Sequence, residues 1–437
     1  MSQEEQQIDP SQGLDNPQDE FLRYNEVDQE IAADDGEEPM DEDDEDEELG
    51  DGGAEGGEEI DESIQIDLSN NSVTYFDKHT DSVFTIFQHP TLPLVCSGGG
   101  DNLAHLWTVH SQPPKFAGML EGHTESVISG GFTSDGKFLV TADMTGKVIV
   151  NASQKGGSRW NKTSELQEVE EIVWLKCHPT IPGVFAFGAT DGSVWCYQID
   201  AQSGSVEQLM SGFAHQEDCT AGEFANISQG ENVLQLITTA TDGSIVGWNG
   251  FTAQQLFKIS KDELKGLEAP WVTISRAPET ANAALVACGS NNGVLAVINA
   301  NNGAVLHLSA VMELQPGEDD IIASIEAIAW SSKLPLMALG LVSGDVLIYD
   351  TTTWRVRHKI NLEESVTKIL IEDENLFVSC INGKVYEYDV RSGQEKFVCL
   401  GHNMGVLDFV LYRRQDAPTR IITAGDEGVS LIFEVPN

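Results

Sequence analysis

The segments DGSVWCY, residues 191–197, and DGSIVGW, residues 242–248, share one pattern: a small polar turn, then an apolar run that ends in an aromatic residue. Their start positions lie 51 residues apart, and six more segments with a similar turn and apolar run occur along the chain at steps of 39 to 51 residues; four of these six also end in an aromatic residue. The six are DNLAHLW (101–107), TGKVIVN (145–151), NGVLAVI (292–298), SGDVLIY (343–349), NGKVYEY (382–388) and EGVSLIF (427–433).

The turn residues and the spacing together predict an all-β radial repeat. Asp-Gly and Asn-Gly suit tight two-residue hairpin turns, in which both central residues take positive φ. The runs behind the turns read as strands, and no helical pattern separates them. A four-stranded unit of about 40–45 residues is typical of a β-propeller blade of the WD-repeat type. We therefore predict an eight-bladed WD-repeat β-propeller; seven blades with one degenerate unit is the alternative.

Both ends of the chain bear on how the ring closes. The sequence stops shortly after the eighth of these segments, so the last blade lacks an outer strand. The run SVTYF, residues 72–76, has the composition of a strand and precedes the first complete unit. We expect it to complete the last blade and remove the exposed edges. The predicted domains are an acidic tail, 1–63, and a propeller, 64–437.

The tail and the propeller differ in composition, but both carry a net negative charge. The chain carries a formal charge of -47 over 437 residues. Residues 1–63 hold 27 acids and one base, and residues 41–48 are eight consecutive acids. Such a segment is expected to be disordered. Strong negative charge disfavours nucleic acids and anionic membranes and favours basic partners.

Several functional classes lack support in the sequence. The triplet Gly98-Gly99-Gly100 is not followed by the Lys-Ser/Thr of a phosphate loop. The seven cysteines form no Cys-x-x-Cys pair, and the histidines recur at repeat positions, which favours structural roles. The N-terminus has no secretory signal, and no apolar run could span a bilayer. We expect no catalytic residues, no cofactor and no metal.

Acids recur in the loops that enter the innermost strands of six of the eight units. Propeller geometry places these loops on the same face as the turns quoted above, and Glu326 lies one residue inside the sixth innermost strand, near the central channel. Converging carboxylates would attract a basic segment, and partly desolvated pairs with Arg would add specificity. Phe84 and Trp271 could stack on Arg, although both also suit core packing. The predicted binding residues are Asp81, Glu125, Glu170, Glu171, Asp218, Glu268, Glu326, Glu364, Asp426 and Glu427.

Longer segments resemble a known family. SVTYFDKHTDSVF, KGLEAPW, ACGSNNG, SCINGKVY and ITAGDEGVSLIFEVPN are similar to segments of the fungal WD-repeat chaperones dedicated to one large-subunit ribosomal protein. The animal relative is angio-associated migratory cell protein. The resemblance covers nearly all of residues 72–437. It implies that an acid in SIEAI, Glu326, and another in AGDEG, Asp426, carry client binding.

The function implied by the resemblance is capture of the basic N-terminal segment of a newly made ribosomal protein. The protein would act as a monomer in the cytoplasm and release its client for late assembly of the 60S subunit. Two alternatives stay open: a WD-repeat scaffold in signalling or cell migration, and a histone chaperone.

Overall fold

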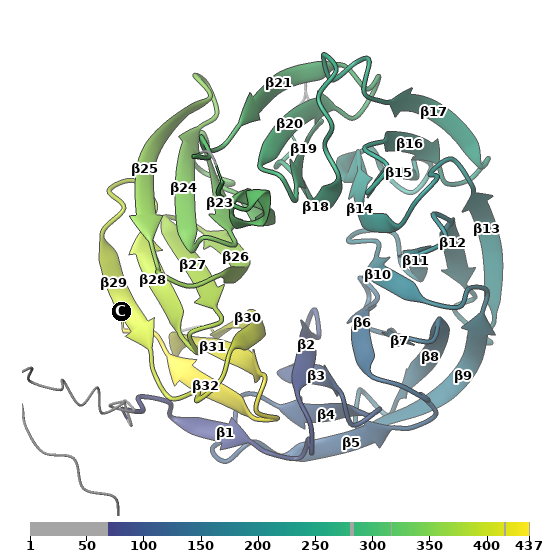
Figure 1. Ribbon diagram of the computed structural model, residues 1–437. Helices are drawn as coiled ribbons and strands as arrows, with labels where there is room; N and C mark the ends of the chain where they lie inside the picture. The colour runs from purple at the N-terminus through teal and green to yellow at the C-terminus, as the bar shows by residue number, and fades with distance from the viewer. Residues whose placement is uncertain (1–68, 280–283, 316, 415–416, 437) are drawn as a thin grey trace, which may run out of the picture. The chain divides into compact units, whose positions relative to one another are not determined.

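Eight four-stranded antiparallel sheets stand around one axis in the computed structural model (Figure 1). The structure describes residues 69–279, 284–315, 317–414 and 417–436, so the predicted tail lies outside the described residues. The prediction of eight blades is confirmed, and the seven-bladed alternative is wrong.

The first four blades follow chain order, and each runs from the innermost to the outermost strand. Blade 1 comprises β2 (Val83–Gln88), β3 (Leu94–Gly99), β4 (Ala104–Thr108) and β5 (Phe116–Leu120); blade 2 comprises β6 (Val127–Phe132), β7 (Phe138–Asp143), β8 (Lys147–Gln154) and β9 (Arg159–Gln167). Blade 3 comprises β10 (Ile172–Cys177), β11 (Val184–Ala189), β12 (Val194–Ile199) and β13 (Val206–Gly212); blade 4 comprises β14 (Cys219–Ala225), β15 (Gln235–Ala240), β16 (Ile245–Asn249) and β17 (Gln254–Ile259), with the short 3-10 helix η1 (Ile227–Gln229) after β14.

The remaining blades continue the order until the last, which takes its outer strand from the N-terminal side. Blade 5 comprises β18 (Trp271–Arg276), β19 (Leu285–Ser290), β20 (Val294–Asn299) and β21 (Val305–Ala310), followed by η2 (Asp320–Ala323); blade 6 comprises β22 (Ile325–Trp330), β23 (Leu336–Leu341), β24 (Asp345–Asp350) and β25 (Arg355–Asn361). Blade 7 comprises β26 (Val366–Glu372), β27 (Asn375–Cys380), β28 (Val385–Asp389) and β29 (Glu395–Cys399); blade 8 comprises β30 (Val406–Arg414), β31 (Ala417–Gly425), β32 (Ser430–Glu434) and β1 (Thr74–Phe76).

Pairing of β1 with β32 closes the ring as predicted from the run at 72–76. Thr74 lies opposite Ile432, and Phe76 lies opposite Ser430. The Phe76 ring stacks on Trp107 of blade 1, with centroids 4.6 Å apart and the ring planes within 6° of parallel. One short strand therefore completes blade 8 and packs against blade 1.

The turns between second and third strands differ from the two-residue type expected. In the turn at residues 189–193, Ala189 N–H donates to the Ser193 carbonyl, and Gly192 N–H donates to the Ala189 carbonyl. Gly192 takes φ 78°, whereas Asp191 does not take a positive φ. These loops are therefore longer than two residues, and glycine supplies the only left-handed position in this one. The expectation of two positive φ angles was wrong.

Hydrophobic clusters fill the spaces between neighbouring blades. Between blades 7 and 8, for example, Phe377, Val385 and Phe397 pack with Phe409 and Phe433. Because each blade buries both faces of its inner strands, the second strands are buried along nearly their whole length. Packing of this kind fixes the ring and leaves the loops to carry binding.

The histidines that recur in four blades are structural, as expected. In each blade Nε2 lies 2.6 to 2.9 Å from a Ser or Thr hydroxyl of the second strand. In blade 1 this hydroxyl, on Ser97, also accepts from Trp107 Nε1 at 3.1 Å. The four residues are His79, His123, His215 and His402.

All seven cysteines are free thiols, and six of them are buried. Burial raises the pKa of Cys177 to about 12, so this half-buried thiol stays protonated near neutral pH. Within the described ranges, the structure has no helix of the length and apolar character required to cross a bilayer.

Candidate functional site

Two sets of loops form one face of the ring, which we call the loop face. It consists of the loops that lead into the innermost strands and the turns between second and third strands. In every blade a backbone bond joins the two: Gly100 N–H donates to the Ser82 carbonyl in blade 1, and Asp426 N–H donates to the Gly405 carbonyl in blade 8. The predicted geometry, with both sets on one face, is therefore confirmed.

These bonds align the blades and correct one register. Asp426 makes the bond that Gly100 makes in blade 1, so it is equivalent to Gly100 and not to Asp101. The equivalent of Asp101 is Glu427: His402 Nδ1 lies 2.5 Å from Glu427 Oε1, as His79 Nδ1 lies 3.0 Å from Asp101 Oδ1. Asp426 is thus an extra carboxylate outside the histidine network.

Glu326 lies at a β-bulge that recurs in all eight innermost strands. In β22 the pairing skips Glu326, between Ile325 and Ala327. The innermost strands surround the central channel (Figure 1). Because neighbouring blades pack on both sides of such a strand, we infer that an exposed side chain on it faces the channel or its mouth. Glu326 is exposed and is the one charged residue at this position; the other seven are Phe84, Ile128, Val173, Thr220, Val272, Thr367 and Leu407.

Serine hydroxyls orient both acids that the family resemblance singled out. Ser324 Oγ, which is buried, donates to Glu326 Oε1 at 2.6 Å. Ser82 Oγ of blade 1 donates to Asp426 Oδ1 of blade 8 at 2.7 Å. Each carboxylate keeps a second oxygen without a described hydrogen bond, so each is held in place while still able to accept from a ligand.

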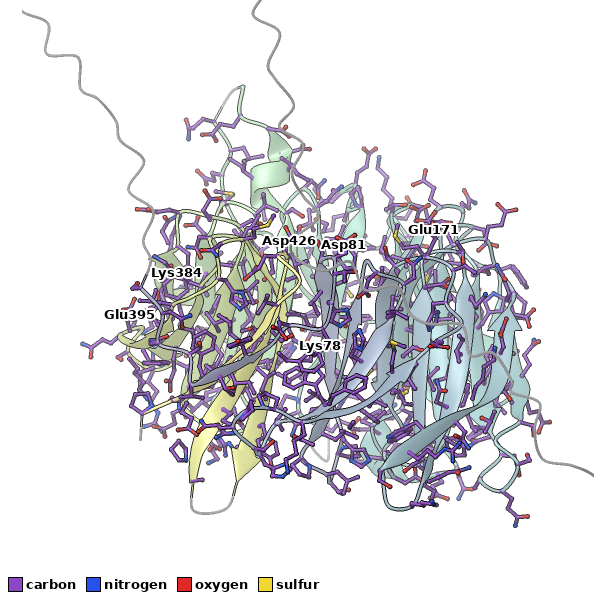
Figure 2. The ribbon with its side chains drawn as sticks, turned by 90° about the horizontal axis from the view of Figure 1, so that it is seen from below. Lys78, Asp81, Glu171, Lys384, Glu395 and Asp426 are labelled. Carbon is purple, nitrogen blue, oxygen red and sulfur yellow. The ribbon has the colours of Figure 1, made fainter. Side chains whose placement is uncertain are left out.

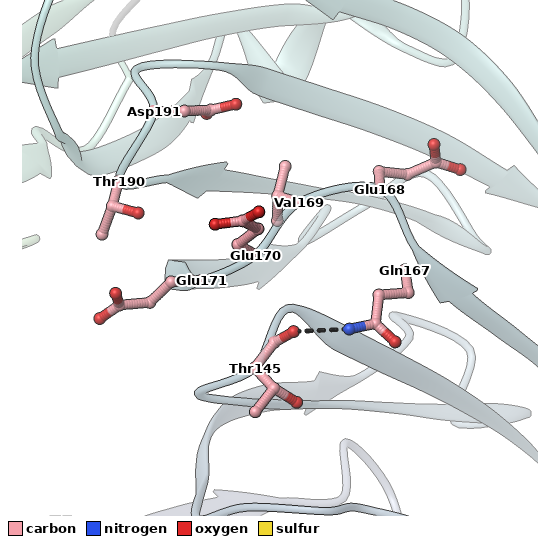
Figure 3. A pocket seen from close by; sticks show the side chains of 8 residues that line it. All are labelled: Thr145, Gln167, Glu168, Val169, Glu170, Glu171, Thr190 and Asp191. Carbon is pink, nitrogen blue, oxygen red and sulfur yellow. Dashed lines mark hydrogen bonds between the residues drawn. The ribbon is translucent and has the colours of Figure 1, made fainter.

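Glu170 and Glu171 line a hollow of about 710 Å³ on the loop face (Figure 3). Glu168 and Asp191 contribute further carboxylates, and Gln167 Nε2 donates to the Thr145 carbonyl at its edge. The carboxylates at its lining suit a cationic side chain. Figure 2 labels Glu171, Asp81 and Asp426 along the same edge of the ring.

Glu268 lines a smaller hollow of about 290 Å³ between blades 4 and 5. Its carboxylate bonds to Lys261, which lowers the pKa of Glu268 and partly neutralises it. Asp218 lies in the loop that enters β14, and its carbonyl accepts from Thr241 N–H. The carboxylates of Asp218, Glu125 and Glu364 belong to exposed residues of the loop face.

Glu427 differs from the other predicted residues because it is committed to the fold. Its Oε1 bonds to His402, as described, and its Oε2 is buried without a described partner. Asp101 and Asp242 are used similarly, since both accept from backbone N–H groups of their own turns. Trp271 is fully buried and donates to the Gly243 carbonyl, so of the two aromatic candidates only Phe84 stays accessible.

A projecting loop before β22 was not predicted from the sequence. The connection from β21 to β22, described at residues 311–315 and 317–324, contains η2, which projects beyond the edge that carries Asp426 and Asp81 (Figure 2). Asp319 caps η2 by accepting from Ile321 N–H at 3.1 Å, while the Ile321 side chain is 45% exposed. Extra acids in a longer-than-average connection were the available signal: Glu313, Glu318, Asp319 and Asp320.

One described group could geometrically hold a metal ion. Donor atoms of His79, Asp101 and His105 lie within 4.8 Å of one another. His79 already bonds to Asp101 and Ser97 in the structural network described above. The hydrogen bonds of these atoms therefore stabilise blade 1. Binding of a ligand by the carboxylates of the loop face does not require a metal ion.

The fold and this face define a WD-repeat propeller with a carboxylate-rich mouth, and comparisons with known proteins agree. The model of the WD domain, G-beta repeat, matches residues 70–108, and the model described as outer membrane protein assembly factor BamB matches residues 101–398. Ribosome assembly protein SQT1 of Saccharomyces cerevisiae is 66% identical over 385 residues, covering 86% of this chain and 89% of that protein. Because this identity extends over the whole propeller, it favours the WD-repeat description over the BamB description. The chain belongs to the SQT1 family of ribosome assembly proteins.

Solved structures support the same assignment. The crystal structure of S. cerevisiae Sqt1 superposes with a TM-score of 0.83 and covers 85% of this chain and all of that one. Chaetomium thermophilum Sqt1, bound to the N-terminus of ribosomal protein L10, is 27% identical with a TM-score of 0.74; the match covers 84% of this chain and all of that one. Human angio-associated migratory cell protein is 25% identical over 82% of this chain and 79% of its own length.

Proposed function

We propose that this protein is a dedicated chaperone in ribosome biogenesis that binds the basic N-terminal segment of a newly made large-subunit ribosomal protein, the counterpart of L10. The observation that carries the proposal is Glu326, a serine-oriented carboxylate at a bulge position that is uncharged in the other seven blades. The complex of the C. thermophilum relative with the N-terminus of L10 supports it.

In this proposal the loop face acts in two stages. The summed field of its carboxylates raises the rate at which a basic segment arrives. Glu326 and Asp426 then accept from Lys or Arg side chains in fixed directions, because Ser324 and Ser82 hold them. The remaining predicted acids contribute negative charge to the loop face; they are Asp81, Glu125, Glu170, Glu171, Asp218, Glu268 and Glu364. Glu427 contributes mainly to the fold of blade 8, through its bond to His402.

The chaperone role needs binding and release but no bond making or breaking. We propose that the protein works without catalysis or a cofactor, as a monomer, in the cytoplasm where its client is made. It would keep the client's basic segment away from RNA until the client joins the 60S subunit late in assembly. Direct contact with nucleic acid is disfavoured by the sign of its charge.

The test is the affinity for a synthetic N-terminal L10 peptide, measured by calorimetry with the full chain. Glu326→Lys and Asp426→Lys should each weaken binding by about 2–5 kcal/mol, because each reverses a partly desolvated pair. Glu207→Lys is the matched control: Glu207 is exposed on β13 and its carboxylate forms no described bond, so its reversal should change affinity by less than about 1 kcal/mol.

Circular dichroism and melting curves should show that all three variants fold. Unchanged affinity in both Glu326→Lys and Asp426→Lys would rule out the assigned site. Equal losses in all three variants would show that total charge, rather than these two positions, governs binding.

A further inference from the structure

Glu387 is a buried carboxylate at a position that is apolar in other blades. It lies in β28, immediately before the β-bulge with β29, and its side chain is 3% exposed. The same bulge recurs between third and fourth strands of the first six blades and aligns them. The equivalent residues there are Leu106, Val150, Cys196, Gly247, Val297 and Ile348.

Glu387 has no hydrogen bond and no ion pair within 4 Å among the described residues. Its cross-strand neighbours are Phe377 and Phe397, which offer no polar group. The nearby Lys396 is engaged elsewhere: Nζ donates to Asn375 Oδ1 at 2.6 Å and lies 3.7 Å from Asp389 Oδ2. Burial raises the pKa of Glu387, and Lys396 only partly opposes this effect.

An unpaired buried carboxylate is costly for folding, so its presence calls for a compensating partner. An apolar residue at this position would extend the cluster between blades 7 and 8, as five of its six equivalents belong to clusters in their own blades. The structure therefore carries a charge where the fold by itself favours none.

The carboxylate faces a hollow of about 450 Å³ between blades 7 and 8. Phe397 forms an apolar wall, Thr419 and Val435 of blade 8 form the opposite side, and Asn375 and Lys396 lie at its edge. Asn375 begins β27 and Thr419 lies near the start of β31. Second strands start on the side of the ring away from the loop face, so this hollow is separate from the proposed client site.

We propose that this hollow binds one cationic side chain, a lysine ammonium or an arginine guanidinium, presented by a partner protein. Glu387 and Asp389 carry two negative charges and Lys396 carries one positive charge, which leaves one negative charge for a ligand to neutralise. Phe397 suits the methylene stem of Lys or the plane of an Arg. The volume accommodates a side chain and its stem rather than a folded segment.

The experiment is a titration of the full chain, carrying ¹³C-labelled Val and Thr methyl groups, with N-acetyl-arginine amide and N-acetyl-lysine amide. The uncharged N-acetyl-citrulline amide has nearly the shape of the arginine probe and is the ligand control. Val435 and Thr419 report on the hollow, and Val173 reports on the loop face. Saturable shifts at Val435 and Thr419 are expected with at least one cationic probe and at least tenfold weaker binding of citrulline amide.

Glu387→Gln keeps the shape and removes the charge, so it should weaken the response at Val435 and Thr419 at least tenfold while leaving Val173 unaffected. Glu207→Gln is the matched charge control and should keep both responses. If Glu387→Gln does not fold, Glu387→Leu, which restores the type of residue found in other blades, takes its place.

Absent shifts at Val435 and Thr419, or equal shifts with citrulline amide or in the Glu387 variants, would overturn the proposal. The client site is tested by a different peptide and by variants on the other face, so either site can fail without the other.

Discussion

The Ser82 hydroxyl of blade 1 donates to Asp426 Oδ1 of blade 8 at 2.7 Å and lies 2.9 Å from the Asp426 carbonyl oxygen. This contact joins residues 344 positions apart, across the junction at which the ring closes. The carboxylate proposed to bind the client is therefore positioned by the neighbouring blade.

Ser82→Ala should weaken binding of the L10 peptide by about two- to tenfold, because Asp426 loses one neutral hydrogen bond but keeps its charge. Ser324→Ala should have a similar effect through Glu326. A double-mutant cycle of Ser82→Ala with Asp426→Asn, followed by calorimetry, measures the coupling. Additive losses would show that Ser82 does not act through Asp426.

Removal of the tail should affect rate more than specificity. The acidic run 41–48 lies outside the described residues, yet its charge adds to the field around the protein at low salt. Deletion of residues 1–62 should slow peptide association in stopped-flow measurements at low ionic strength and have little effect at physiological salt. Loss of discrimination between the L10 peptide and an unrelated basic peptide would instead make the tail the recognition site.

A slightly longer deletion should damage the fold. Removing residues 1–76 takes away β1, exposes the edge of β32 and unstacks Phe76 from Trp107. We expect a large drop in melting temperature and aggregation, because an unpaired edge strand recruits other chains. Phe76→Ala alone should cost about 3–5 kcal/mol in the free energy of unfolding. Equal stability of the two truncated proteins would contradict closure by β1.

Acid should destabilise the propeller through buried histidines. Burial lowers the pKa of His105 to about 4, with a further contribution from His79 that outweighs the opposing effect of Asp101, and neither ring nitrogen of His105 has a described hydrogen bond. An unfolded chain binds the proton near pH 6.5, whereas the native one does not, so stability falls as pH decreases from 6.5 towards 4. At pH 5 the loss from His105 is about 2 kcal/mol.

His105→Phe removes this titration and retains an aromatic ring between Phe76 and Phe116. The difference in melting temperature between pH 7.5 and pH 5 should be smaller in the variant than in the natural protein. The same difference in both proteins would show that other groups dominate acid sensitivity.

Messenger RNAs that co-purify with the tagged protein should separate the three functional classes. A chaperone that captures its client during synthesis enriches the message of the L10 counterpart. Enrichment of histone messages would support a histone chaperone, and several unrelated protein partners without message enrichment would support a scaffold.

The fold was predictable because each blade repeats the same local signals. Turn residues before runs such as DGSIVGW give the number and spacing of blades, and the run at 72–76 indicates the closing strand. The detailed turn geometry was not predictable, because Asp-Gly serves both two-residue turns and longer ones in which only glycine is left-handed.

The site was predictable only in outline. Acids in the loops indicate the sign of the face, but the register of Asp426 depends on its bond to Gly405. Ser82 and Ser324 are ordinary serines in the sequence, and their role depends on contacts that form only in the folded ring. Glu387 could not be assigned to a face of its strand until the bulge before Tyr388 fixed the pairing.

Pairing of β1 with β32 also determines when the ring can close during translation. The ribosome makes residues 74–76 before the rest of the propeller, and their partners at 430–432 follow more than 350 residues later. At about 5–20 residues per second, the first strand waits for roughly 20–70 s before its partner exists. Until then blade 8 is incomplete and Ser82 has no Asp426 to hold. A protein proposed to protect another nascent chain therefore has a complete loop face only after residues 426–432 of its own chain have been made.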